Sequence, residues 1–178
     1  MEEARLKDAG SGLTPVTPGW FVVNVRDAEW WFADTRGGRC AFENEYGDTP
    51  VEFKQLGINL TILEPGQTTL YHAEANQEGF VVLAGQCVLI VEGEERRLKQ
   101  WDFFHASPGT LHIIVGAGDG PCAILMAGAR WEGNKIHYPR DELAARYDAS
   151  SPEDTNDSKV AYSGWERTFE RVPSVWPV

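Results

Sequence analysis

Short apolar segments separated by turn residues fill the middle of the chain. Glycine, proline and charged residues interrupt the apolar positions at 64–66, 84–85 and 92–94, and no helical repeat lies between these breaks. The expected strands cover residues 57–63, 68–74, 78–83, 87–91, 96–98, 103–105, 110–115 and 122–129. Strands of this length and spacing predict an all-β sandwich or barrel.

The N-terminal part of the chain is expected to supply an arm and the first strands. Residues 1–18 are polar and rich in Gly and Pro, which predicts a flexible arm. The apolar segments 20–25 and 29–32 predict two short strands, and residues 44–50 predict a loop. The barrel domain is therefore expected to cover residues 19–130.

The C-terminal part, residues 131–178, is expected to add a short helix and an extended tail. Proline begins the segment 139–147 and acidic residues occupy its first turn, as at a helix N-terminus. The tail carries too much apolar surface for a free end, so we expect it to pack on the barrel or on a partner subunit. Its large apolar residues are Trp165, Phe169, Val172 and Trp176.

Composition and charge narrow the class of protein and its partners. The chain has 178 residues, 42% of them hydrophobic, which suits one domain with its own core. A net charge of −11 repels phosphate backbones and anionic bilayers, so neither nucleic acid nor a membrane is expected as a partner. The first residues lack the apolar core of a signal peptide, and no apolar run approaches the roughly 20 residues of a membrane span. A cytoplasmic location is therefore expected.

Four ionisable side chains are predicted to meet at one point. His72 and Glu74 have the same parity on one expected strand, so they point to the same face. Glu78 opens the next strand, and His112 follows a Ser-Pro-Gly turn at 107–109. Polar groups on the inner face of a small barrel are costly unless they are paired or bind a metal. Imidazole and carboxylate ligands together suit a first-row divalent metal ion.

These residues resemble the first sequence motif of the cupin superfamily. That motif has the form G-x5-H-x-H-x3-4-E-x6-G, and residues 66–85 fit it with Gly66, His72, Glu78 and Gly85. Glu74 stands where the second histidine of the motif usually stands. The chain therefore keeps the spacing of the motif but exchanges one imidazole for a carboxylate.

The second cupin motif is matched less fully, by residues 101–116. Gly109 and His112 fit the form G-x5-P-x-G-x2-H-x3-N. The departures are Trp101, Ser107 and Gly116, which replace the usual Gly, Pro and Asn. The resemblance implies a jelly-roll barrel, or double-stranded β-helix, with one metal ion at its end. It also implies a homodimer, because cupins commonly pair through their sheets.

The role of Glu74 leaves two metal sites open. If Glu74 binds, two histidines and two carboxylates form a hard, charge-neutral set that suits Mn, Fe or Ni, with Zn as an adventitious occupant. If Glu74 turns away, His72, Glu78 and His112 leave the two-histidine, one-carboxylate arrangement that suits ferrous iron. In the second case Glu74 is expected to hydrogen-bond a ligating histidine or to act as a base.

The pocket around the metal is expected to be apolar. Its expected lining is drawn from Leu60, Ile62, Leu70, Phe80, Val82, Phe104, Ile114, Ile124 and Met126. Neither arginine nor lysine is evident in this set, which argues against a sugar phosphate as substrate. His105 and His137 are expected to be packed or surface histidines, with a pocket base as the alternative for His105.

The cysteines are not expected to carry the chemistry. Cys40, Cys87 and Cys122 have no C-x-x-C spacing, and the last two lie inside apolar strands. Buried free thiols are the simplest interpretation, and a redox or ligand role is the alternative.

Three functions remain open from the sequence. The favoured one is a metal-dependent enzyme that acts on a small organic molecule, of the oxygenase, isomerase or lyase type, with Glu74 or a bound hydroxide as base. The second is a non-catalytic barrel that binds or senses a small ligand. The third is a structural module without a metal. The fold alone does not choose among the three, because one fold can carry many functions.

Overall fold

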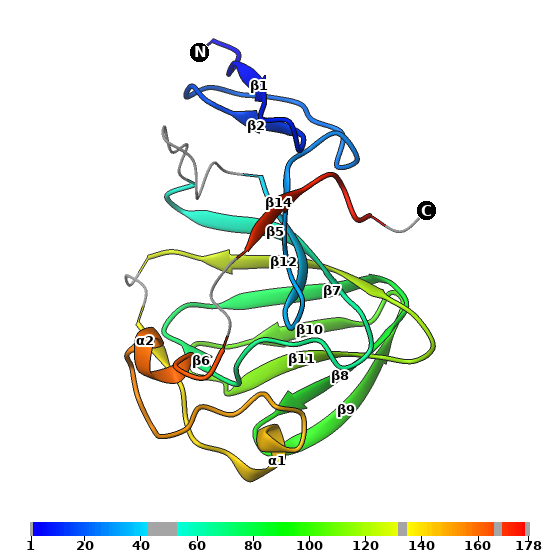
Figure 1. The fold of residues 1–178 in the computed structure, drawn as a ribbon. Coiled ribbons are helices and arrows are strands. Elements are labelled where there is room, and N and C mark those ends of the chain that lie inside the picture. Colours follow the sequence, from blue (N-terminus) through cyan, green and yellow to red (C-terminus); the bar gives the residue numbers. More distant parts are fainter. Residues whose placement is uncertain (1, 43–52, 132–134, 166–168, 177–178) are drawn as a thin grey trace.

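Two antiparallel sheets form the body of the molecule. The computed structural model describes residues 2–42, 53–131, 135–165 and 169–176. The larger sheet has seven strands in the order β10-β7-β12-β5-β4-β3-β14, and the smaller has three in the order β11-β8-β9. In Figure 1 the smaller sheet lies against the end of the larger one that carries β7 and β10.

The strands of the larger sheet are β3 (Trp30–Ala33), β4 (Gly37–Ala41), β5 (Leu56–Leu63), β7 (Glu78–Ala84), β10 (Phe103–Ala106), β12 (Cys122–Ala129) and β14 (Glu170–Val172). The smaller sheet consists of β8 (Gln86–Val91), β9 (Glu94–Lys99) and β11 (His112–Ala117). Two-stranded sheets pair β1 (Leu6–Asp8) with β2 (Leu13–Pro15) and β6 (Ala73–Glu74) with β13 (Ile136–His137). The described helices are α1 (Glu142–Ala145) and α2 (Ser158–Ala161).

The main core lies between the two sheets. Val82 from β7, Leu89 from β8 and Ile124 from β12 are almost completely buried in it. Burial of each such side chain contributes about 1.5–3 kcal/mol to folding. Phe80 and Ile114 belong to this core and also line a cavity next to it. The core therefore fixes one wall of that cavity.

Most of the strands predicted between residues 57 and 129 are confirmed. One exception is 68–74, of which only Ala73–Glu74 is a strand, preceded by an isolated bridge between His72 and His112. The strand predicted at 20–25 is wrong, because the carbonyl group of Asn24 accepts hydrogen bonds from the backbone of Asp27 and Ala28 and closes a turn. The loop predicted at 44–50 lies outside the described residues.

The terminal segments pack against the larger sheet. β14 pairs with β3, and Val172 and Trp176 pack on a second core around the fully buried Trp30. The arm predicted over residues 1–18 contains β1 and β2, and the backbone of Leu13 bonds that of Asp27 and Glu29. Val23, Val25 and the C-terminal residues Val172, Val175 and Trp176 pack on the outer face of the larger sheet.

The predicted C-terminal helix is reduced to a single turn. Asp141 caps the N-terminus of α1 by accepting a hydrogen bond from Ala144 N at 2.7 Å. Asp148 follows at φ 55, in the left-handed region that a continuing helix cannot adopt. A second turn of helix, α2, was not predicted. Within the described ranges no helix has the length and hydropathy of a membrane span.

Candidate metal centre

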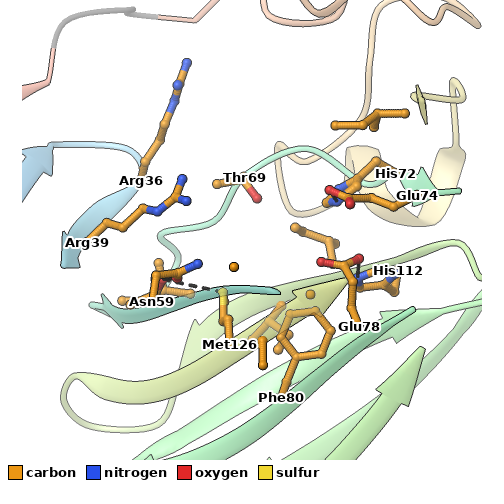
Figure 2. Close-up of a pocket in the computed structure, with 18 of the residues that line it drawn as sticks. Arg36, Arg39, Asn59, Thr69, His72, Glu74, Glu78, Phe80, His112 and Met126 are labelled. Atoms are coloured by element: carbon orange, nitrogen blue, oxygen red, sulfur yellow. Dashed lines mark hydrogen bonds and ion pairs between the residues drawn. The ribbon is translucent and has the colours of Figure 1, made fainter. Parts of the chain in front are cut away.

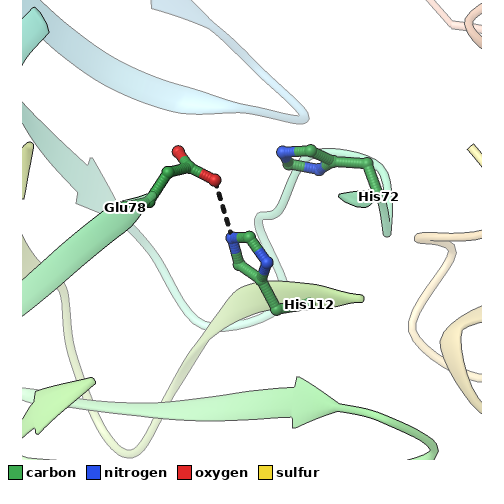
Figure 3. Close-up of side chains that lie close together, drawn as sticks. All are labelled: His72, Glu78 and His112. Atoms are coloured by element: carbon green, nitrogen blue, oxygen red, sulfur yellow. Dashed lines mark ion pairs between the residues drawn. The ribbon is translucent and has the colours of Figure 1, made fainter. Parts of the chain in front are cut away.

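Three of the predicted ligands come together at the start of three elements. His72 lies just before β6, Glu78 opens β7 and His112 opens β11. Reciprocal backbone hydrogen bonds join His72 and His112, with N–O distances of 3.1 and 2.8 Å. One ligand atom from each of the three side chains lies within 4.8 Å of the other two. Figure 3 shows the three side chains pointing toward one another from separate segments of the chain.

Backbone carbonyl groups orient both imidazole rings. His72 Nδ1 lies 2.6 Å from Leu70 O, and His112 Nδ1 lies 2.9 Å from Thr110 O. A carbonyl oxygen only accepts hydrogen bonds, so Nδ1 carries the proton in each ring. The Nε2 atoms are then left with a lone pair directed at the point between the three side chains, as a metal ligand requires.

The charge of the three groups suits a divalent cation. Glu78 Oε2 is buried and accepts no hydrogen bond of good geometry, although it lies 3.3 Å from His112 Nε2. A buried carboxylate oxygen without a donor is costly, and a cation at this point would remove that cost. Because two neutral imidazoles and one carboxylate are common ligands of Zn, Fe and Mn, the residues fit a bound metal.

The pKa values of the two histidines shift in opposite directions. Burial, and then the neighbouring His112, lower the pKa of His72, which favours its neutral form. Burial also disfavours the charged form of His112, but the nearby Glu78 carboxylate and the Thr110 carbonyl outweigh it and raise the pKa of His112. A metal ion would therefore compete with a proton chiefly at His112.

Glu74 lies beside this cluster without joining it. Its Oε1 atom is 3.9 Å from His72 Nε2, and the described cluster of three ligands does not include it. Burial and then repulsion from Glu78 raise the pKa of Glu74 to about 7, while Arg130 and Arg39 act in the opposite direction. The four-ligand set predicted from the sequence is thus present as three close residues and one neighbour.

Aromatic rings pack around the histidines. The ring of Phe80 has its centroid 5.2 Å from that of His112, and the ring of Phe104 lies at 5.5 Å. The ring centroid of Tyr138 lies 5.9 Å from that of His72. These contacts limit the rotation of both imidazoles and exclude water from one side of the site.

A cavity of about 580 Å³ opens beside the three ligands. His72, Glu74, Glu78 and His112 all line it, and Figure 2 shows them along one side. A volume of this size suits a small organic molecule.

The predicted apolar lining is correct for Phe80, Ile114 and Met126, but wrong for several other positions. Leu60 and Ile62 face the second core instead, and Asn59 and Thr61 line the cavity. The reason is that the terminal segments cover the outer face of β5, so its apolar residues point outward and its polar ones inward.

Residues 59–128 match a family model described as the cupin domain. The match contains all four residues of the predicted site. This segment of the chain is therefore a cupin domain. No curated protein matches this cupin in sequence.

One solved structure with a TM-score of 0.50 supports the fold, and a second is similar over a smaller part of the chain. A sugar phosphate isomerase from a cupin superfamily of Silicibacter pomeroyi has a TM-score of 0.50 and 24% identity, over 66% of this chain and 69% of its own. A putative sugar phosphate isomerase from Acidithiobacillus ferrooxidans has a TM-score of 0.46 and 26% identity, over 56% of this chain. The cupin spans 64% of that second chain, slightly less than two thirds of its length.

Three arginines line the cavity of this cupin, contrary to the expectation of a lining without cations. They are Arg36, Arg39 and Arg130. Arg36 lies in the turn before β4, Arg39 lies within β4, and Arg130 follows β12. No strand had been predicted at residues 37–41, where β4 lies. The missed signal is the pairing of β4 with β5, which places Arg39 opposite Thr61.

Proposed function

We propose that this cupin is an enzyme that holds one divalent metal ion at His72, Glu78 and His112 and acts on a small organic molecule. The observation that carries the proposal is the convergence of three ligand atoms within 4.8 Å at the wall of a cavity of about 580 Å³. Three protein ligands leave further positions for water or substrate, as catalytic metal sites require.

A bound metal ion would polarise an oxygen atom of the substrate or activate water or dioxygen. The protein holds the two imidazoles in the tautomer that presents Nε2, because Leu70 and Thr110 accept the Nδ1 protons. The packing of Phe80 and Phe104 against His112 keeps bulk water from one side. Reactions of the oxygenase, isomerase or lyase type all fit such a site.

Glu74 is proposed as the group that moves a proton. Its carboxylate lines the cavity and lies 3.9 Å from His72 Nε2, close enough to meet a substrate held by the three ligands. A role as a fourth metal ligand is the alternative. Metal content separates the two, because Glu74→Gln should keep the metal if Glu74 moves protons and lose it if Glu74 binds the metal.

Open coordination and turnover test the proposal together. Protein loaded with Mn²⁺ is expected to speed the relaxation of water protons, because water exchanges at the open positions. A panel of small carbonyl and hydroxyl compounds is then followed by NMR with metal-loaded wild type and with His112→Ala. We expect one compound to be consumed by the wild type alone.

The alternative function predicts a different result. A non-catalytic cupin that anchors its ligand through the metal would bind a compound of the panel without consuming it. A filled coordination shell, with no exchangeable water and no turnover, would contradict the enzyme proposal and support that alternative.

A further inference from the structure

Arg39 lies across the cavity from the three metal ligands. It belongs to β4, whereas Glu78 belongs to β7, and β5 and β12 lie between these strands. Three spacings between strands correspond to about 14 Å along the sheet. In Figure 2 the side chain of Arg39 extends toward Thr69, at the far side of the cavity from Glu78 and His112.

The register of the larger sheet explains why Arg39 faces inward. Arg39 pairs with Thr61, and Thr61 pairs with Ile124, so the three side chains share one face. Ile124 belongs to the core between the sheets, which identifies this face as the inner one. Arg39 is therefore a half-buried cation on the inner wall, beside the polar Asn59 and Thr61.

The charge of the cavity is opposite to that of the whole protein. Among the described residues the lining contains three arginines and two glutamates, which gives these residues one net positive charge, while the chain carries −11. A divalent metal would make the cavity more positive still. Charges in a recessed site act more strongly than charges on an open surface, so the cavity would attract an anion.

Arg36 is held in place by aromatic rings at the edge of the cavity. Its guanidinium carbon lies 4.5 Å from the ring centroid of Tyr162, 5.4 Å from that of Trp165 and 5.2 Å from that of Phe169. Cation–π contacts of this kind keep a guanidinium group charged and fixed. Arg36 thus adds positive charge on the same side of the cavity as Arg39. Its guanidinium group packs on these rings, so Arg39 is the better candidate to contact a ligand.

We propose that Arg39 binds an anionic group of the substrate, so that the substrate is a small organic acid or phosphate whose other end reaches the metal. A guanidinium group binds carboxylate or phosphate through paired hydrogen bonds. The inference rests on the proposed function of the three ligands. It adds the substrate class and the residue that selects it.

Matched probes test the role of Arg39 in protein loaded with Mn²⁺. 2-Oxoglutarate and 2-oxopentanoate share a 2-oxo acid end and differ in the distal carboxylate. 3-Phosphoglycerate and glycerate differ in the distal phosphate. Each is titrated by calorimetry into wild type, Arg39→Gln, Arg39→Lys and the control Arg97→Gln, whose side chain is exposed on β9.

The wild type and the Arg97→Gln control are expected to bind the anionic member of at least one pair about 10-fold more tightly, as a charge-assisted hydrogen bond implies. The pair that shows the preference identifies carboxylate or phosphate as the preferred group. Arg39→Gln should reduce the ratio to about 1, and Arg39→Lys should retain part of it. Absence of a preference from both pairs, or its persistence in Arg39→Gln, would overturn the inference.

The metal content of each preparation separates this inference from the proposed function. The preference depends on Arg39 and not on the metal, so metal-free protein should show the same ratio at lower affinities. If the purified protein holds no metal but keeps the ratio of affinities between the matched probes, only the proposed function is refuted. A protein that holds metal without the ratio would refute only the role of Arg39.

Discussion

Removing the charge of Glu74 should stabilise the metal-free protein, and only at high pH. In the folded chain burial and the nearby Glu78 raise the pKa of Glu74 to about 7, from an ordinary value of 4.5. The folded state therefore binds this proton more tightly than the unfolded state does. The contribution of Glu74 to stability is complete below pH 4.5 and is lost as the pH rises through 7. Glutamine does not ionise, so the Glu74→Gln variant does not lose this stability as the pH rises.

The size of the change in the free energy of unfolding follows from the pKa shift of Glu74. A difference of about 2.5 pKa units corresponds to about 3 kcal/mol at pH 8. The side chain of Glu74 is 21% exposed, so solvent screening places the measured value below this ceiling. We therefore expect the free energy of unfolding of Glu74→Gln to exceed that of the wild type by up to about 3 kcal/mol at pH 8. At pH 4.5 the gap should be small.

Urea unfolding of chelator-treated protein, followed by tryptophan fluorescence at pH 4.5 and pH 8, measures this gap. Comparison of wild type and Glu74→Gln at each pH cancels the titration of groups that do not interact with Glu74. Glu153→Gln is the matched control, because its side chain is exposed. Added metal should abolish the advantage of Glu74→Gln, because a nearby cation favours the ionised carboxylate. A gap that does not change with pH would refute the assigned environment of Glu74.

Three further predictions concern the core, a close backbone contact and the metal centre. Phe80→Ala should cost about 3–5 kcal/mol in urea unfolding and weaken metal binding, because the ring fills the core and packs on His112; unchanged metal affinity would contradict the second part. Gly116→Ala should destabilise by about 1–3 kcal/mol, because its Cβ would lie against Glu64 O, whereas Gly120→Ala, with no atom within 4 Å, should cost little in the same assay. The raised pKa of His112 predicts that metal affinity begins to fall above pH 6.5 as the pH is lowered. Constant affinity down to pH 5 in a competition titration would argue against histidine ligands.

The sequence predicted the body of the fold because turn residues mark the end of most strands. It failed on the inner face of β5, where alternation alone favoured Leu60 and Ile62. The pattern shows which residues share a face but not which face is inside. That choice depends on the terminal segments, which cover the outer face and bury Leu60 and Ile62 there.

The cluster of His72, Glu78 and His112 was predictable because motif spacing fixes these residues at or beside the start of their strands. The position of Glu74 beside the cluster was not, because parity gives the face of a side chain and not its distance from a point. Arg39 was missed for another reason. It lies outside both motifs and reaches the cavity only through the pairing of β4 with β5, which local sequence does not reveal.

The metal content of protein purified without chelator or nickel resin tests the central claim most directly. Wild type and His112→Ala are compared with His105→Ala, because the His105 side chain is exposed and bonds only Ser107 among the described contacts. The metal centre predicts about one metal ion per chain in the wild type and in His105→Ala, and its loss in His112→Ala. Wild type without metal, or His112→Ala that keeps its metal, would contradict the claim that these residues form a metal centre.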